Sequence, residues 1–469
     1  MRRPLSLLCL AALSATGIAV AGPAAAAPAP KAAPAEAAAV ADELVVGYVV
    51  GAQPSSRDRA RGRAAAKLEK RVVAARGNRA EVELVHLPQG KDRKRAIAEL
   101  QSDPAVAYAE PNWIYTTQAK PAPPTAPTAA PDYYSNGSLW GMYGDTSKPT
   151  NQYGSQAAEA WATGATGSDA VYVGVIDEGI QFTHPDLDGN VWTNPLESVN
   201  GRDDDGNGYV DDVHGYDFAN NDGTVYDGGT RGSSDDHGTH VAGTIGAENE
   251  SASSVPSTVS PQVGVVGVNQ QVTMISGKFL GARGGSLADA VRALDYFTDL
   301  KTERGLNIVA TNNSWGGGAY ATSLLQAIQR SNNAGILFIA AAGNSGTNND
   351  TTASYPSNYD VPNVIAVAAI DKTGALATFS QYGQRTVDLG APGVDIWSTT
   401  ALNGYSAYNG TSMATPHVTG AAALYASTHP GATAAQIKNA LLTSVVPTAS
   451  LATKTTTGGR LNVSAALTN

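Results

Sequence analysis

The stretch YNGTSMATPHVTGAAALYAS, residues 408–427, reads as a buried helix with an unusual beginning. Residues 418–425 are small and apolar, as in a helix that is packed on all sides. The segment nevertheless opens with a flexible turn at Gly410 and carries Ser412 and Pro416 in its first turns. A serine at this place holds its hydroxyl at the positive end of the helix, where backbone N–H groups can meet a developing oxyanion. A serine at such a place is usually an ordinary helix cap, so the rest of the chain decides whether Ser412 is a nucleophile.

Three other polar residues stand where a predicted strand ends or a predicted helix begins. Asp177 ends the apolar run VYVGVID (171–177), and Asn344 ends GILFIAAAGN (335–344). His237 lies where the apolar helix of DDHGTHVAGTIGA begins. Each residue alone is more often a cap, a turn residue or a structural histidine. Together with Ser412 they supply the carboxylate, imidazole, hydroxyl and oxyanion donor that nucleophilic acyl transfer needs.

The chain after residue 131 alternates apolar strands with amphipathic helices. Such alternation predicts an α/β fold with a mostly parallel central sheet flanked by helices, whose sites lie at the carboxyl ends of the strands. The predicted strands are 171–177, 272–280, 307–315, 335–344 and 363–371, and the clearest helices are 287–303 and 322–333.

The motifs VIDEGI, HGTHVAGTI, AAAGNSG and GTSMATPHV closely resemble those of the subtilisin-like serine proteases (subtilases), as do SWGG (314–317) and YP (355–356). The resemblance covers residues from about 137 to 465. It implies a subtilisin-like fold in which Asp177 orients the imidazole, His237 is the general base and then acid, and Ser412 is the nucleophile. Asn344 would donate its amide to the oxyanion beside the backbone N–H of Ser412.

The same resemblance implies a substrate cleft walled by two backbone segments. The implied substrate-binding residues are Ser314, Trp315, Gly316, Gly317, Ala340, Ala341, Ala342, Gly343, Ser354, Gly284 and Gly285. The two walls contain no charged residue, so we expect a preference for Phe, Tyr, Leu or Met before the cleaved bond. Ser354 stands where the family often has glycine and should shorten the pocket, and Trp315 should reshape a subsite further along the substrate.

The N-terminus predicts export. Arg2 and Arg3 precede a short apolar run, and an Ala-x-Ala cleavage pattern falls at about Ala26, so we expect residues 1–26 to be a secretory signal peptide. A membrane span is the weaker alternative, because the run is short and lacks a charged stop. The chain's one cysteine, Cys9, lies inside this signal, so we expect a secreted protein without disulfides or thiol catalysis.

A small unit precedes the main body. Residues 27–118 should form an α+β, ferredoxin-like propeptide with strands at 43–50, 80–87 and 105–115 and helices at 56–74 and 92–100. The Pro-Ala-Thr-rich segment 119–131 is a predicted linker, and 132–469 is the predicted catalytic domain. The ending AEPNWIY resembles subtilase propeptides, which inhibit the catalytic domain, and an unrelated accessory domain is the alternative.

Charge is divided unevenly between these parts. Residues 1–131 contain 17 Lys and Arg and 11 Asp and Glu, which leaves 14 and 30 for 132–469, a net charge of −16. These opposite net charges favour docking of the basic propeptide on the acidic catalytic domain. The acidic body argues against nucleic acid as a partner. We expect a monomer that acts on protein and peptide substrates and has no membrane domain.

The acidic loop NGRDDDGNGYVDDVHGYDF (200–218) predicts calcium. Asp203, Asp205, Asn207 and Asp211 supply oxygen ligands at alternating spacing, although His214 stands where an EF-hand loop has its glutamate. A solvated acidic turn is the alternative. By resemblance, Asp217 and Asp222 are further candidates. Asp186 matches another family ligand, but the facing loop is altered by the insertion 248–262, which puts that site in doubt.

Glu178 departs from the family pattern, which more often has Ser or Thr after the catalytic aspartate. Successive residues point in opposite directions, so we expect Glu178 to face away from Asp177 and to matter little. The sequence as a whole predicts a calcium-supported serine endopeptidase made as an autoprocessed precursor. One alternative is a catalytically silent binding protein on the protease fold, but no triad residue is missing. A triad esterase is another, but the chain has Gly-Thr-Ser-Met-Ala (410–414) in place of Gly-x-Ser-x-Gly.

Overall fold

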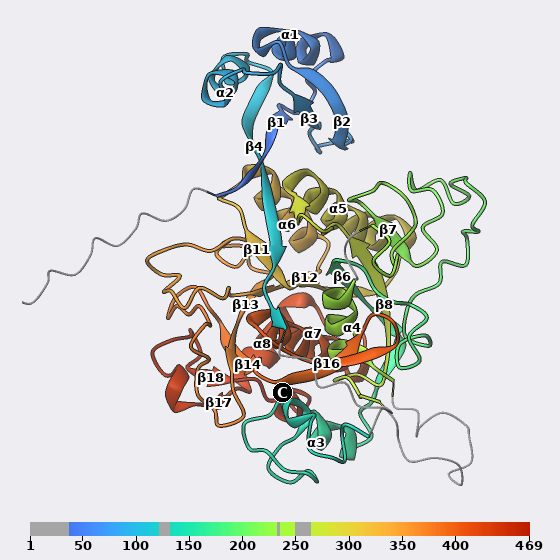
Figure 1. Cartoon of the computed structure of the whole chain (residues 1–469), viewed down its shortest axis with the longest axis vertical. Coiled ribbons are helices and arrows are strands. Elements are labelled where there is room, and N and C mark those ends of the chain that lie inside the picture. Colours follow the sequence, from blue (N-terminus) through green and yellow to red (C-terminus); the bar gives the residue numbers. More distant parts are fainter. Residues whose placement is uncertain (1–36, 122–131, 232–234, 249–263) are drawn as a thin grey trace, which may run out of the picture. The chain divides into compact units, whose positions relative to one another are not determined.

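The computed structural model describes residues 37–121, 132–231, 235–248 and 264–469 (Figure 1). The predicted signal peptide and most of the predicted linker and of the 248–262 insertion lie outside these ranges. No helix within the described ranges is both long and apolar enough to span a bilayer.

The N-terminal part folds as β-α-β-β-α-β, the ferredoxin-like order, with its two helices on one side of the sheet (Figure 1). The strands pair antiparallel in the order β4-β1-β3-β2. Leu44, Val46, Ala60 and Leu100 belong to one buried core between the sheet and the helices. The elements are β1 (Ala39–Tyr48), α1 (Pro54–Ala64), β2 (Lys67–Val73), β3 (Val82–His86), α2 (Arg93–Gln101) and β4 (Val106–Thr117).

The predicted helix 56–74 is wrong in its second half. Helix α1 ends at Ala64, and Ala65 takes the left-handed conformation (φ 53°) that terminates it. Residues 67–73 form strand β2, which pairs with β3 and buries Val72 and Val73. The helix-forming residues of this segment are overridden by pairing with the neighbouring strand.

The main body contains a nine-stranded sheet in the order β17-β18-β14-β13-β12-β10-β6-β8-β7. All neighbours pair in parallel except β17 and β18. This arrangement confirms the predicted fold class and all five predicted strands. The strands are β6 (Gly167–Asp177), β7 (Gly215–Asp217), β8 (Gln271–Lys278), β10 (Ile308–Asn313), β12 (Leu337–Ala341), β13 (Val364–Ile370), β14 (Leu389–Pro392), β17 (Val446–Pro447) and β18 (Gly459–Arg460).

Helices cover both faces of this sheet. Successive residues of β6 show the division, because Val175 belongs to a core that includes Val418 of α7, whereas Ile176 belongs to a core that includes Phe297 of α5. A strand buried on both faces must be apolar throughout, which is why β6 reads as a continuous apolar run. The helices are α3 (Ala157–Ala162), α4 (Asp236–Gly246), α5 (Leu287–Arg304), α6 (Thr322–Asn333), α7 (Thr411–Thr428), α8 (Ala434–Thr443) and α9 (Val463–Ala466), with short 3-10 turns at Trp140–Met142 and Ala449–Leu451.

Strand β4 leaves the N-terminal sheet and continues between segments of the main body. It pairs antiparallel with β11 (Trp315–Gly317) on one side and β9 (Gly285–Ser286) on the other. Shortly after β4, β5 (Lys120–Pro121) pairs with β16 (Gly404–Asn409), which also pairs with β15 (Ile396–Thr400). The backbone around residues 118 and 119 is thereby held on both sides.

Candidate active site

A buried aspartate–histidine pair joins the end of a strand to the start of a helix. Asp177 is the last residue of β6, and His237 is the second residue of α4. The Nδ1 of His237 lies 2.7 Å from Oδ1 of Asp177, which is fully buried. Burial alone would lower the pKa of His237, but the carboxylates of Asp177 and Glu178 outweigh it, so the pKa is raised. Among the described residues, Nε2 of His237 has no hydrogen-bond partner.

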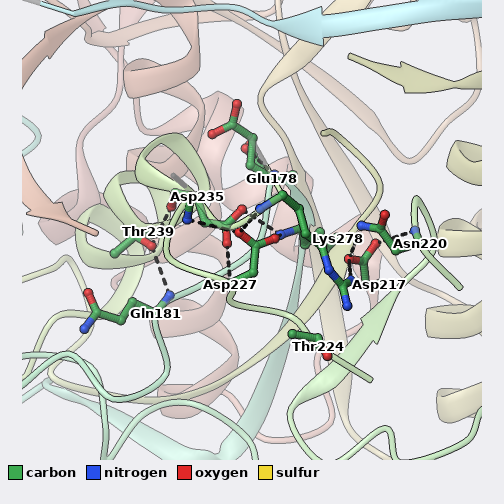
Figure 2. A network of polar contacts seen from close by, with 12 residues as sticks. Glu178, Gln181, Asp217, Asn220, Thr224, Asp227, Asp235, Thr239 and Lys278 are labelled. Atoms are coloured by element: carbon green, nitrogen blue, oxygen red, sulfur yellow. Dashed lines mark hydrogen bonds and ion pairs between the residues drawn. The ribbon is translucent and has the colours of Figure 1, made fainter. Parts of the chain in front are cut away.

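A buried lysine fixes the beginning of α4. Lys278, at the end of β8, donates from Nζ to Asp227 and to Asp235, at 2.8 Å in each case. Figure 2 shows the lysine side chain directed at these two carboxylates. Asp235 is the residue before α4 and takes a left-handed conformation (φ 59°). Because all three groups are nearly inaccessible to solvent, this ion pair anchors the segment that carries His237.

Ser412 lies in the first turn of α7, and Pro416 explains how this turn is used. Proline has no N–H, so the carbonyl of Ser412, four residues earlier, receives no helical hydrogen bond from it. The hydroxyl of Ser314 donates to that carbonyl instead, at 2.9 Å. The hydroxyl of Ser412 in turn donates to the carbonyl of Ser314 at 2.8 Å. These two bonds tie the start of α7 to the segment after β10.

Two donors converge on one peptide carbonyl beside Ser412. The Nδ2 of Asn344 donates to the carbonyl of Gln118 at 2.6 Å, and the backbone N–H of Ser412 donates to the same oxygen at 3.1 Å. The Oδ1 of Asn344 accepts from the N–H and the hydroxyl of Thr411, which turns the amide nitrogen toward Gln118. A side chain on Gly410 would collide with that carbonyl, because its Cβ would lie 2.3 Å from the oxygen.

Residues 114–118 occupy one wall of the predicted cleft as an added strand. The N–H of Gln118 donates to the carbonyl of Ser314, and Tyr115 pairs with Gly317 and with Gly285. A Cβ on Gly284 would lie 2.3 Å from the carbonyl of Tyr115, so glycine allows the close approach. Tyr115 is fully buried edge-on against Trp315, with ring centroids 5.1 Å apart.

The second predicted wall lies at and after the end of β12. Ala340, Ala341 and Ala342 are buried, and Gly343 has φ 112°, a conformation that L side chains rarely adopt. A Cβ on Gly343 would lie 3.1 Å from Oγ of Ser354, which places Ser354 at this wall. Among the described residues, no hydrogen bond joins Ala340–Gly343 or Ser354 to residues 114–118.

The expectation that Glu178 faces away from the site is wrong. One of its carboxylate oxygens accepts from the N–H of His237 at 3.3 Å, and its own N–H donates to Oδ1 of Asp177 at 2.8 Å. The free N–H groups at the start of α4 attract a carboxylate, which outweighs the alternation expected of an extended strand. Burial raises the pKa of Glu178, while the neighbouring His237 lowers it.

The acidic loop brings together a set of carboxylates that differs from the predicted set of calcium ligands. Glu197, Asp203 and Asp205 each place a carboxylate oxygen within 4.8 Å of the other two. Asn207 donates to Asp205. Asp211 lies outside the group and accepts from the backbone N–H groups of Asn200 and Gly201. The spacing signal missed Glu197 because this residue precedes the loop.

The remaining candidate ligands also have protein partners, as Asp205 has in Arg304, 3.0 Å from its carboxylate. Arg231 lies between Asp217 and Asp222, 3.4 and 2.9 Å from their carboxylates, so a guanidinium stands where a cation was expected. Asp186 accepts from the hydroxyl of Tyr405 and the N–H of Val265.

A peptide carbonyl held by two donors beside a serine, in a chain that also has a buried imidazole–carboxylate pair, is the arrangement expected of a serine peptidase. Comparisons with known proteins agree. The subtilase family model matches residues 168–465, and a model of the fervidolysin N-terminal prodomain matches residues 25–112. The chain belongs to the subtilase family and is a serine endopeptidase.

Individual relatives show how far the likeness extends. A thermophilic serine proteinase of Bacillus sp. (strain AK1) is 35% identical over 332 residues, which are 71% of this chain and 66% of that protein. Subtilisin E of Bacillus subtilis (strain 168) is 34% identical over 74% of this chain and 72% of its own length. The crystal structure of fervidolysin from Fervidobacterium pennivorans, a keratinolytic enzyme related to subtilisin, is 24% identical with a TM-score of 0.66. It covers 94% of this chain, which spans 62% of that one, and supports the fold.

Proposed function

We propose that the protein hydrolyses peptide bonds through Ser412, His237 and Asp177, with Asn344 and the Ser412 N–H as oxyanion donors. The observation that carries the proposal is the Gln118 carbonyl, which accepts from both donors. The short distance from His237 to Asp177 supports a base held in one tautomer, with Nε2 left to receive a proton.

The reaction then follows from the positions of these groups. The Ser412 hydroxyl turns from the Ser314 carbonyl to His237, gives its proton to Nε2, and its oxygen bonds to the substrate carbonyl carbon. The two donors stabilise the charge that develops on the carbonyl oxygen. The imidazolium passes the proton to the leaving nitrogen as the C–N bond breaks. Water, deprotonated by His237, then cleaves the ester and restores Ser412.

Residues 27–118 act as a propeptide that assists the folding of the catalytic domain and inhibits it. Beyond the cleft, Glu110 accepts from the N–H groups of Thr322 and Ser323 at the start of α6. Ion pairs join Lys70 to Asp289 and Arg79 to Asp295, both on α5. Basic groups before the linker thus meet acidic groups after it, in line with the uneven charge of the sequence. The enzyme is exported as this precursor, with residues 1–26 as its signal.

The precursor cleaves itself between Gln118 and Ala119, because the carbonyl of that bond lies on the oxyanion donors. The mature enzyme should therefore begin at Ala119, and mass spectrometry of the secreted product should find this N-terminus. If the N-terminus lies elsewhere, and is already there at the earliest times of processing, the Gln118–Ala119 bond is not the one that is cleaved.

Specificity should follow the apolar character of the cleft. Peptides with Phe, Tyr, Leu or Met before the cleaved bond should be preferred, since burial of an unpaired charge there costs several kcal/mol. Counting Gln118 as the first residue, Tyr115 is the fourth before the bond, and its contact with Trp315 favours an aromatic side chain there as well. A library varied separately at these two positions measures both preferences. Preference for Arg or Lys at the first position would contradict the proposal.

Calcium stabilises the acidic loop through Glu197, Asp203 and Asp205. These oxygen donors suit a hard divalent cation, and Oε2 of Glu197 is buried without a hydrogen-bond partner among the described residues. Nearby Asp212 is fully buried, and burial raises its pKa to about 7, with the charges of Asp205 and Glu197 adding to the effect. A cation would offset this concentration of negative charge.

Chelation should therefore lower the melting temperature of the mature enzyme, inhibited to prevent self-digestion, by on the order of 5 °C, and added calcium should restore it. Glu197→Gln should reduce this response. The carboxylate of Asp222 pairs with Arg231, so Asp222→Asn should retain the response to chelator. An identical melting curve with and without chelator would contradict the calcium site.

A further inference from the structure

The carboxylate of Glu178 lies at the catalytic pair but has no part in the mechanism above. It immediately follows Asp177 and accepts from the N–H of His237 at 3.3 Å. The backbone N–H of Glu178 donates to Oδ1 of Asp177, the oxygen that contacts the imidazole of His237. Glu178 thus contacts both members of the pair, and its side chain is partly accessible to solvent.

The other charged or titratable groups near this pair have partners or pKa values that set them apart from Glu178. Asp235 is paired with Lys278, and Asp236 accepts from the N–H of Ala401. Burial raises the pKa of Asp235 to about 6, and burial lowers the pKa of His240 to about 3, so His240 is neutral at ordinary pH. Among the described residues, the groups that interact electrostatically with His237 or Glu178 are Asp177 from β6, Asp235 and His240 at or in α4, and Tyr408 from β16. Behind them, Lys278 and Asp227 pair with or face Asp235, His417 faces His240, and Asp236 faces Tyr408.

We propose that Glu178 is a positioning residue that holds the start of α4 and stabilises the imidazolium form of His237, so that it sets the acid limit of the peptidase. This inference rests on the proposed triad. It adds a second carboxylate to the one that the triad requires. Both act through the same imidazole, Asp177 by a direct hydrogen bond to the ring and Glu178 by its charge and by its bond to the backbone of His237.

The sign of the effect follows from the charge. A carboxylate favours the protonated imidazole, so the presence of ionised Glu178 raises the pKa of His237. The general base must be neutral to accept the serine proton, and activity is lost as pH falls through its pKa. Removal of the Glu178 charge should therefore lower that pKa and extend activity to lower pH.

Glu178→Gln tests the charge and keeps an oxygen that can accept from the His237 N–H. One pH unit below the wild-type midpoint of the acid limb, the variant should retain about three- to five-fold more of its plateau kcat/KM than the wild type. Its plateau should stay within about two-fold. Glu178→Asp should restore part of the wild-type profile, and Asp236→Asn should move the limb by less than half as much as Glu178→Gln.

Two readouts on the mature enzymes decide the matter: kcat/KM for a neutral peptide, and the rate of inactivation by a sulfonyl fluoride, each measured across the acid range. The second reports on the free enzyme without substrate charge. Coincident acid limbs for wild type and Glu178→Gln, with both proteins folded by circular dichroism, would overturn the inference while leaving the triad intact. A wild type that is neither active nor inactivated would instead refute the proposed function on which the inference rests.

Discussion

Ser412→Ala is expected to lower kcat of the mature enzyme by about 10⁶-fold, the size found for the serine of subtilisin, from which this magnitude is taken. The variant lacks the nucleophile but retains Asn344 and the backbone N–H, so a small residual rate over water should remain. In the precursor, the same change should stop self-cleavage. The uncut chain should then accumulate, with Gln118 still held in the site, and can be detected by its mass.

The control for this change lies on the same helix. Ser427 is near the end of α7, and its hydroxyl donates only to the carbonyl of Leu424 among the described residues. Ser427→Ala should process and hydrolyse peptides like the wild type. If Ser412→Ala, produced alone in a host without other processing proteases, still yields the shortened protein at the normal rate, Ser412 is not the nucleophile for maturation.

Asn344→Leu should lower kcat by about 10²–10³-fold with little change in KM, again by analogy with the corresponding asparagine of subtilisin. Leucine has a similar volume but cannot donate a hydrogen bond. The loss should therefore fall on the transition state, in which the carbonyl oxygen carries more charge than in the bound substrate. Steady-state kinetics on one peptide substrate separate the two constants.

Asn333→Leu makes the same exchange at the exposed end of α6 and should leave both constants near those of the wild type. A variant at Asn344 with an unchanged kcat, or one whose whole loss appears in KM, would contradict the role of this amide as an oxyanion donor.

The sequence predicted the parts of the site that depend on local signals. Asp177 and Asn344 follow apolar strands, and His237 and Ser412 begin apolar helices. The structure pairs Asp177 with His237, and it places donors from Asn344 and Ser412 on one carbonyl, that of Gln118. The predicted substrate segments around Ser314 and Gly284 likewise lie along residues 114–118.

The features that the sequence did not predict depend on contacts between distant segments. Strand β2 has helix-forming residues and becomes a strand only by pairing with β3. Glu197 joins the acidic loop from outside its spacing pattern, and Arg231 reaches Asp217 and Asp222 from the next loop. Glu178 turns toward His237 because the start of α4 offers an unpaired N–H. The sequence pattern of a single segment cannot predict such contacts between distant segments.

The most direct test of the central claim is covalent labelling of the mature enzyme with a serine-directed fluorophosphonate, followed by peptide mass mapping. The account predicts one label per molecule, located on Ser412, with peptide hydrolysis lost in proportion to labelling. Full activity after labelling of Ser412, or loss of activity with the label on another residue and Ser412 unmodified, would contradict it.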